Sequence, residues 1–355
     1  MYFVVPLLAA LSKRAASTFY FCVLALLSRV AAWGGLAYPG RRSGMIPIGI
    51  FTLGALVTLA VSGQQPGQIT APNSSLDQVR QLLQSGNLEG AESVARLYVA
   101  GHPNSPDGHY VLGRILFLEK KAADSLAEFT AGAKYRTPTV DDLKVVASDY
   151  VVLGDYTDAD TWFTKAVGWA PNDAQGWYYL GRTKYNENRF EEAVKAFKRC
   201  LELDPKNVKA EDNLGLSYAG LGRNDEALAA YHTAIDWQKD APTKEFGPYL
   251  DLGTLLVETN KSREAIPYLQ EALQLNANDP KIHNQLGKAY LHANELVKAQ
   301  AELERAVALA PDSAPEHFML GQIYRKEGHE DKAKEELARF TQLNGAHSTD
   351  VNGVH

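Results

Sequence analysis

The stretch WYYLGRTKY, residues 177–185, contains one tryptophan, three tyrosines, an arginine and a lysine within nine residues. This composition is typical of binding surfaces, because aromatic rings and arginine side chains bury large areas and still carry a polar group. It also suits the packed interior between helices. The role of each side chain depends on the helix face that it occupies, and a longer pattern in the chain decides those faces.

The residues around this stretch recur with a period of 34 residues. A unit that begins at Ala174 has fixed places for Leu180-Gly181, Ala193, Phe197 and Pro205. The Leu-Gly pair returns in the same place in other units, at Leu112-Gly113, Leu214-Gly215, Leu252-Gly253, Leu286-Gly287 and Leu320-Gly321. One interval is longer by four residues, which places an insertion near residues 242–245. Eight such units and the insertion together span residues 72–347.

Each unit predicts two amphipathic helices joined by a short turn, because apolar residues recur at spacings of three and four. The glycine at the eighth position and the alanine at the twentieth are small, which lets the two helices approach closely. Prolines such as Pro171, Pro205 and Pro311 end the second helix, since proline lacks an N–H donor and clashes with the preceding turn. A single helix pair leaves apolar surface exposed, so successive units are expected to stack.

This pattern, kept in phase over about three quarters of the chain, resembles the tetratricopeptide repeat family. The resemblance implies an all-α fold, a right-handed superhelical solenoid of about eight stacked helix-turn-helix repeats over residues 72–347. It also implies that the first helix of each unit lines a concave groove, mainly through positions 2, 5, 9, 12 and 13. Proteins or peptides bind in the grooves of this family.

The groove positions of this sequence carry aromatic, basic and amide side chains. The predicted partner-binding residues are Tyr110, Arg114, Phe117, Lys144, Tyr178, Arg182, Tyr185, Asn284 and Lys288. Tyr178, Arg182 and Tyr185 are spaced i, i+4 and i+7, so they share one side of a helix. Arginine can bind a carboxylate through two hydrogen bonds, which suits a partner with acidic groups. In the alternative interpretation, the tyrosines and arginines stack on one another and only cover the groove.

The charge of the chain argues against nucleic acid as a partner. The formal net charge is −6, yet the first 63 residues contain no Asp or Glu and five basic residues. The remaining chain is therefore more acidic than the whole, and an acidic body repels a phosphate backbone. We expect the partner to be a protein or peptide.

No arrangement of residues indicates catalysis. The two cysteines, Cys22 and Cys200, cannot form a disulfide framework or a zinc site, and the nine histidines include no HExxH motif. The glycines of GLGRND, residues 220–225, belong to a turn between helices, and no strand precedes them as a phosphate-binding loop requires. We expect no enzyme activity, no cofactor and no metal.

The N-terminal segment, residues 1–63, is interpreted as a leader. Residues 46–62 are uncharged and mostly apolar, and they follow Arg41-Arg42. A basic flank before an apolar run is typical of a secretory signal peptide, although this run is also close to the length of a membrane anchor. Residues 45–63 are thus a cleaved signal peptide or a retained anchor, and residues 1–44 are a misassigned start if translation begins at Met45. Either version predicts an extracytoplasmic body, periplasmic or secreted, that is free or anchored.

The remaining boundaries are a linker at 64–71 and a disordered tail at 348–355, which is too polar to form a capping helix. The leading functional hypothesis is a non-catalytic scaffold that binds a protein or peptide partner in the groove, outside the cytoplasm. The alternative is a self-associating or membrane-anchored structural component of an envelope assembly, with its contact at the open end near Phe340.

Overall fold

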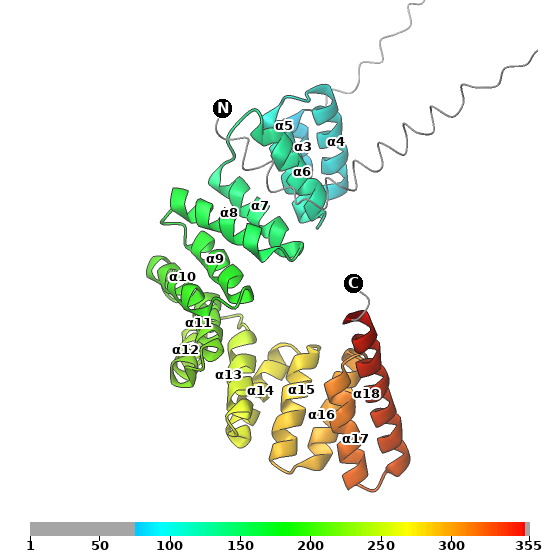
Figure 1. The fold of residues 1–355 in the computed structure, drawn as a ribbon. Helices are drawn as coiled ribbons and strands as arrows, with labels where there is room; N and C mark the ends of the chain where they lie inside the picture. The colour runs from blue at the N-terminus through cyan, green and yellow to red at the C-terminus, as the bar shows by residue number, and fades with distance from the viewer. Residues whose placement is uncertain (1–74, 352–355) are drawn as a thin grey trace, which may run out of the picture. The chain divides into compact units, whose positions relative to one another are not determined.

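The computed structural model describes residues 75–351, and all regular secondary structure in that range is α-helical (Figure 1). The predicted leader (1–63) and linker (64–71) lie outside the described residues. Within residues 75–351, no helix combines the length and the apolar character that crossing a membrane requires.

The chain divides into two compact units between Pro138 and Thr139. The described part of the first unit, residues 75–138, contains two helix pairs: α3 (Leu76–Gln84) with α4 (Leu88–Gly101), and α5 (Pro106–Leu118) with α6 (Ala122–Ala133). Its core lies between the pairs, where Val79 of α3 and Ala91 of α4 pack with Leu112 and Ile115 of α5.

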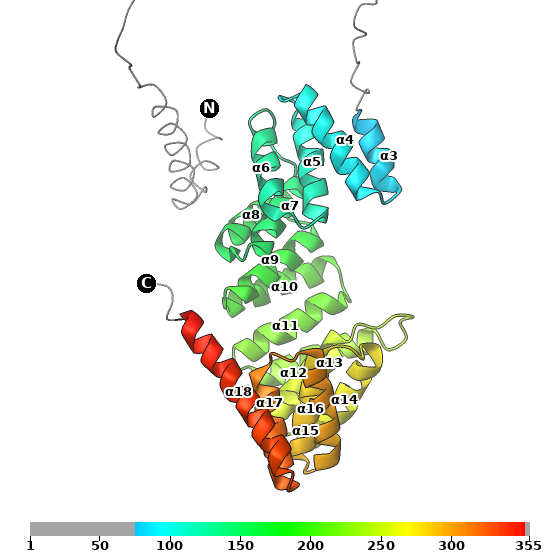
Figure 2. The same cartoon turned by 90° about the vertical axis from the view of Figure 1, so that its right-hand side faces the viewer.

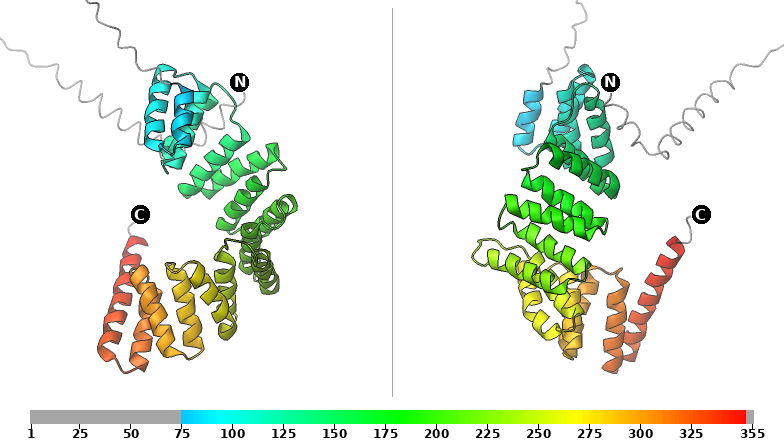
Figure 3. Two further views of the ribbon diagram at one scale, coloured as in Figure 1. Left: turned by 180° about the vertical axis from the view of Figure 1, so that it is seen from behind. Right: turned by 60° about the vertical axis from the view of Figure 1, so that its left-hand side comes forward.

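The described part of the second unit contains six helix pairs that follow one another in chain order (Figure 3). They are α7 (Val140–Val152) with α8 (Tyr156–Trp169), α9 (Ala174–Asn186) with α10 (Phe190–Leu203), α11 (Val208–Gly220) with α12 (Asn224–Trp237), α13 (Gly247–Glu258) with α14 (Ser262–Leu275), α15 (Pro280–His292) with α16 (Leu296–Leu309), and α17 (Ala314–Lys326) with α18 (Glu330–Val351). The all-α architecture of stacked helix-turn-helix repeats is confirmed.

The turn inside every pair uses the same backbone device. One residue per turn has positive φ, and these residues are Gly86, Lys120, Gly154, Asn188, Gly222, Asn260, Asn294 and Gly328. In the α9–α10 turn, the N–H of Asn188 donates to the carbonyl of Tyr185, and that of Arg189 donates to the carbonyl of Lys184. This is the Schellman arrangement, which satisfies the last carbonyls of the first helix and reverses the chain.

Small residues allow the paired helices to approach, as the sequence pattern predicts. A Cβ atom added to Gly181 of α9 would lie 2.7 Å from a ring carbon of Phe197 in α10. Ala193 of α10 is fully buried on the same side. The Leu-Gly pair and the alanine are therefore packing residues, and they mark the interior of each repeat.

A second feature of the interior is a histidine clamp at the fourth position of three units. His283 Nδ1 lies 2.7 Å from Glu302 Oε2, and its Nε2 lies 3.1 Å from the carbonyl of Ala277. His109 and His317 repeat this geometry with a glutamate and a proline carbonyl. In the α9 unit, Trp177 Nε1 donates to the carbonyl of Pro171 over 2.9 Å instead. Each glutamate contact joins the two helices of one repeat, and each contact to a backbone carbonyl ties a first helix to the end of the preceding repeat.

The last helix is longer than predicted. Helix α18 runs to Val351, past the predicted end of the solenoid at residue 347 (Figure 2). Residues 348–351, predicted as the start of a disordered tail, are therefore helical. No proline follows the last repeat, so its second helix is not ended in the way that Pro171 or Pro311 ends the helices before them.

Candidate partner-binding groove

Helix α9 carries the stretch with which the sequence pattern begins, and its start is built by Asp173. The Oδ1 atom of Asp173 accepts a hydrogen bond of 3.1 Å from the backbone N–H of Gln175, which caps the helix. From this cap, Leu180 and Gly181 turn into the core. Lys184 is also buried, with its Nζ 2.7 Å from Asp160 Oδ2 of α8. These residues are structural.

Tyr178, Arg182 and Tyr185 occupy the remaining face of α9. The rings of Tyr178 and Tyr185 are half-buried, whereas Arg182 is exposed. The Arg182 guanidinium lies 5.9 Å from the centre of the Tyr178 ring. Arg182 therefore stacks on Tyr178, as the alternative interpretation expects. The guanidinium is nevertheless exposed to solvent, so its hydrogen-bond donors remain available. Burial raises the pKa of both tyrosines, so their hydroxyls remain neutral donors.

A hollow lies beside Tyr178, between α9 and the start of α11. Its volume is about 320 Å³, and its lining is Gln175, Tyr178, Tyr179, Asp204, Asn207 and Lys209. Asn207 caps α11 by accepting from the N–H of Ala210 over 3.0 Å, and Asp204 accepts from the Asn207 side-chain amide over 2.8 Å. The floor of this α9 hollow is therefore held by capping interactions.

In the first compact unit, Tyr110 of α5 is not available to a partner. It is 3% exposed, and its hydroxyl donates to the carbonyl of Arg136. The ring fits because residue 132 is glycine: a Cβ atom there would lie 2.7 Å from Tyr110. The prediction of Tyr110 as a contact residue is therefore wrong. The predicted neighbours on α5 differ, since Arg114 is exposed and Phe117 is half-buried.

Lys144 of α7 is occupied by ion pairs. Its Nζ lies 3.0 Å from Asp141 Oδ1 and 2.8 Å from Asp173 Oδ2, which joins α7 to the cap of α9. Burial alone would lower the pKa of Lys144, but the two carboxylates raise it above its ordinary value. The ammonium is charged and already neutralised, so it contributes to stacking between repeats.

Asn284 and Lys288 line a second hollow, of about 510 Å³, on helices α13, α15 and α17. The lining of this α15 hollow is Leu250, Asp251, Thr254, Pro280, Lys281, Asn284, Gln285, Lys288, Ala310, Ser313 and Glu316. Asp279 caps α15 by accepting from the N–H of Lys281 over 2.9 Å. The side-chain amide of Asn284 donates to Glu316, which also accepts from the Ser313 hydroxyl. The structure thus brings these two predicted residues together.

The sequence reasoning missed two acidic side chains on the first helices, Asp251 and Asp212. Asp251 of α13 lines the α15 hollow, and burial raises its pKa from 3.8 to about 7, partly opposed by Lys281. Burial raises the pKa of Asp212 on α11 well above its ordinary range, and the charges of Asp251 and Glu245 add to the effect. Asp212 occupies position 5 of its unit, so the groove register could have identified it. Asp251 lies one position later in its unit, outside that register.

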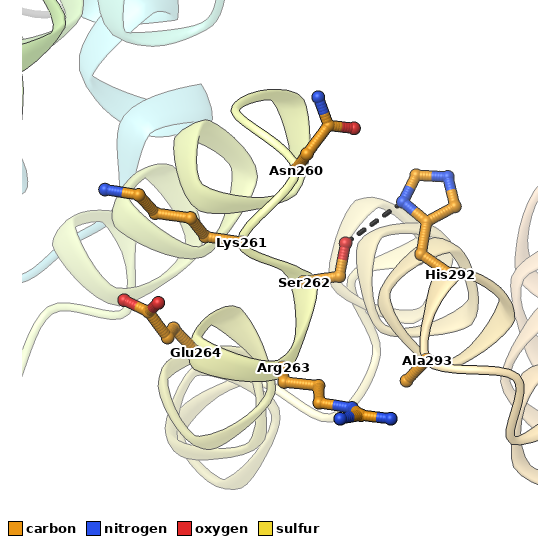
Figure 4. A pocket seen from close by; sticks show the side chains of 7 residues that line it. All are labelled: Asn260, Lys261, Ser262, Arg263, Glu264, His292 and Ala293. Atoms are coloured by element: carbon orange, nitrogen blue, oxygen red, sulfur yellow. Dashed lines mark hydrogen bonds between the residues drawn. The ribbon is translucent and has the colours of Figure 1, made fainter.

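A third hollow, of about 420 Å³, lies where the start of α14 meets the end of α15 (Figure 4). The Ser262 hydroxyl and His292 Nδ1 are 3.0 Å apart across it. The side chains of Lys261, Arg263 and His292 point in different directions, so they do not converge on one point. Near the C-terminal end, the Phe340 ring is half-buried and lies 5.0 Å from that of Phe318, which is 39% exposed.

The described residues contain no group of three or more His, Cys, Asp or Glu side chains placed to hold a metal ion. Cys200 is fully buried in α10, and burial raises the pKa of its thiol to about 11. The thiol is therefore protonated and inert at neutral pH.

The helix pairs form stacked helix-turn-helix repeats, and the α9 and α15 hollows lie along the first helices of those repeats. Tetratricopeptide repeat family models match residues 76–139, 256–320 and 317–347. A model described as the middle TPR-like domain of cilia and flagella-associated protein 70 matches residues 143–276. The chain belongs to the tetratricopeptide repeat family.

Relatives of known name share only part of their length with this chain. Protein O-mannosyl-transferase TMTC3 of Mus musculus is 27% identical over 158 residues, which is 41% of this chain and 17% of the relative. The PEX5-related protein of Homo sapiens is 34% identical over 123 residues, 35% of this chain and 17% of the relative. This chain therefore spans less than one fifth of the length of either protein.

A solved structure shares the fold over a longer stretch. The tetratricopeptide repeat protein from Parabacteroides merdae has 18% sequence identity and a TM-score of 0.58, and the match covers 70% of this chain and 96% of that one. At this identity the likeness concerns the fold alone.

Proposed function

We propose that this chain is a non-catalytic scaffold that binds a protein or peptide partner in the groove formed by the first helices of its repeats, outside the cytoplasm. Membership of the tetratricopeptide repeat family supports the general role, since such repeats commonly mediate interactions between proteins. The observation that carries the groove assignment is the exposed Arg182 guanidinium above the half-buried Tyr178 ring, beside the α9 hollow.

Tyr178 and Arg182 form a suitable contact for a partner segment. Both side chains offer large area together with hydrogen-bond donors, which is the composition of interaction hot spots. Because the ring is already held against Phe197 and Tyr179, with ring centres 6.1 Å and 5.6 Å away, little side-chain entropy remains to be lost on binding.

The extracytoplasmic location rests on the sequence of the N-terminal segment. Residues 46–62 form an apolar run after Arg41-Arg42, in the order of a secretory signal peptide or anchor. The acidic repeat region that follows is the part that would reach the far side of the membrane.

The groove assignment is tested by replacing Tyr178 and Arg182 together with alanine. The variant is expected to keep its helical circular dichroism, because Arg182 is exposed and Tyr178 packs only against the edge of the core. It is expected to capture about tenfold less of a protein that co-purifies with the full chain. Lys195→Ala is the matched control, since Lys195 is an exposed cation on the second helix α10. Undiminished capture by the double variant, measured by quantitative mass spectrometry, would contradict the assignment.

A further inference from the structure

Helix α15 presents a row of hydrogen-bond donors to the α15 hollow. Lys281, Gln285 and Lys288 are spaced i, i+4 and i+7, so they share one side of the helix, and all three line the hollow. Their side chains form no hydrogen bond or ion pair with a described residue. Lys281 is exposed, whereas Lys288 is half-buried. The row therefore brings two unpaired ammonium groups to one hollow.

Other groove lysines of the second compact unit are paired within the chain. Lys144 of α7 lies within 3.0 Å of carboxylates from Asp141 and Asp173. Lys209 at the start of α11 lies 3.2 Å from Glu245 Oε1. An unpaired lysine at a groove position is thus not the rule in this unit, and the α15 row contains two.

The two acidic side chains that line the hollow do not neutralise this row. Glu316 is 8% exposed and accepts hydrogen bonds from the Asn284 amide and the Ser313 hydroxyl, so its carboxylate is held in the wall. Asp251 forms no ion pair with a described residue, and burial raises its pKa to about 7, partly opposed by Lys281. At pH 6 its carboxyl is mostly protonated. The α15 side of the hollow therefore carries uncompensated positive charge.

We propose that the α15 hollow binds an acidic segment of the protein partner, in which two side-chain carboxylates pair with Lys281 and Lys288. The inference rests on the proposed function and names the chemistry of one contact in it. A lysine ammonium has three donors and no acceptor, so a carboxylate is its complement. The Gln285 amide lies between the two lysines and donates to a main-chain carbonyl of the same segment. The hollow, at about 510 Å³, has room for these groups.

The spacing of the two lysines suits an extended segment. About 10 Å of helix axis separates Lys281 from Lys288, because an α-helix rises about 1.5 Å per residue. Three residues of an extended chain span roughly the same length. Two acidic residues with two others between them therefore reach both lysines.

The net charge of the chain makes this contact a local one. The formal net charge is −6, so an acidic segment is not attracted by the protein as a whole. It gains only where unpaired cations gather on the groove. Arg182 of the α9 site is a further exposed cation on a first helix of the same compact unit, so the proposed contact there favours the same kind of segment.

The test uses the full chain and three dye-labelled nine-residue Gly-Ser peptides with amidated C-termini, so that no terminal carboxylate competes with the side chains. Two positions, with two residues between them, are glutamate, glutamine or lysine. Fluorescence anisotropy is measured at pH 6 and about 0.15 M salt, where long-range attraction is screened. The glutamate peptide is expected to bind about tenfold more tightly than the glutamine peptide, and the lysine peptide most weakly.

Lys281→Gln combined with Lys288→Gln is expected to remove most of the glutamate advantage. The matched control combines Lys195→Gln with Lys334→Gln, because it removes the same charge from exposed, unpaired lysines on the second helices α10 and α18. The control should change binding of the glutamate peptide by less than about twofold. Circular dichroism checks that both double variants stay helical.

Equal binding of the glutamate and glutamine peptides, no binding of the glutamate peptide, or an equal loss in both double variants would each overturn the inference. The comparison of the peptides on the wild type does not depend on the folding of any variant. Because partner capture through Tyr178 and Arg182 is measured separately, failure here leaves the proposed function standing.

Discussion

At the scale of single residues, the main finding is that groove positions with similar side chains have different surroundings. Tyr110 and Tyr178 occupy the same place in two repeats, but Tyr110 is buried against Gly132, whereas Tyr178 is half-buried. The place of Gly132 is taken in the α10 helix by Cys200, which is fully buried. The glycine on the second helix therefore makes room for the ring of Tyr110, and the repeat of Tyr178 has a side chain at that place.

Asp251 leads to a prediction about pH and stability. Its pKa is raised from 3.8 to about 7 by burial, so the folded chain holds this proton more firmly than the unfolded chain. The stabilisation is fully present below about pH 4, declines as pH rises, and is lost above about pH 7. Asp251→Asn stays neutral throughout, so its free energy of unfolding should exceed that of the wild type by about 1–3 kcal/mol at pH 8 and by less at pH 5.

Urea unfolding followed by circular dichroism from pH 5 to 8 measures this difference. Glu258→Gln serves as the control, because it removes an exposed carboxylate from the same helix. A stability difference between Asp251→Asn and the wild type that does not change with pH would contradict the assignment of the raised pKa to Asp251.

At the scale of the elements, each helix pair is closed by one residue in the left-handed conformation. Glycine or asparagine occupies seven of these eight described turns, and Lys120, with a φ of 62°, occupies the turn between α5 and α6. A side chain with a Cβ atom is strained there, and asparagine tolerates the conformation better than lysine does. The α5–α6 turn is therefore the least favourable of the set.

Lys120→Gly is expected to raise the free energy of unfolding by about 0.5–1 kcal/mol, because relief of strain exceeds the extra entropy of the unfolded chain. The converse change, Gly154→Ala in the α7–α8 turn at a φ of 77°, should lower it by about 1–2 kcal/mol. Chemical denaturation of the two variants provides the measurement. Changes of the same sign in both would show that the turns do not obey one rule.

At the scale of the whole molecule, the two compact units have separate cores. Residues 193–333 contribute one continuous cluster of buried apolar side chains, and the α3–α5 cluster belongs to the first unit. Stability in repeat proteins is approximately a sum of repeat and nearest-neighbour terms. We therefore expect the six pairs from α7 to α18 to hold enough of these terms to fold without the rest of the chain.

A fragment of residues 139–355 is expected to fold independently. Its circular dichroism per residue should be at least as helical as that of the full chain, and its thermal unfolding should be cooperative. A fragment that aggregates or unfolds without a transition would show that the first unit is needed to complete the fold.

The sequence by itself determined the repeat architecture and its register. Helices α5, α7, α9, α11, α15 and α17 begin at the first residue of a predicted unit, and α13 begins one residue after its unit starts. The helix starts could be predicted because helix caps, Leu-Gly pairs and turn residues are local signals that recur every 34 residues. Each recurrence indicates the same starting residue for the repeats.

Only the tertiary structure decided which groove residues are open to a partner and which are used in packing. Lys144 is neutralised by Asp173 from the next repeat, and Tyr110 is buried because a glycine on its partner helix leaves room for the ring. Asp251 gains its raised pKa from burial between helices, and Lys281 of the next repeat partly opposes that shift. These properties arise from contacts across tens of residues, so a pattern with a period of one repeat does not contain them.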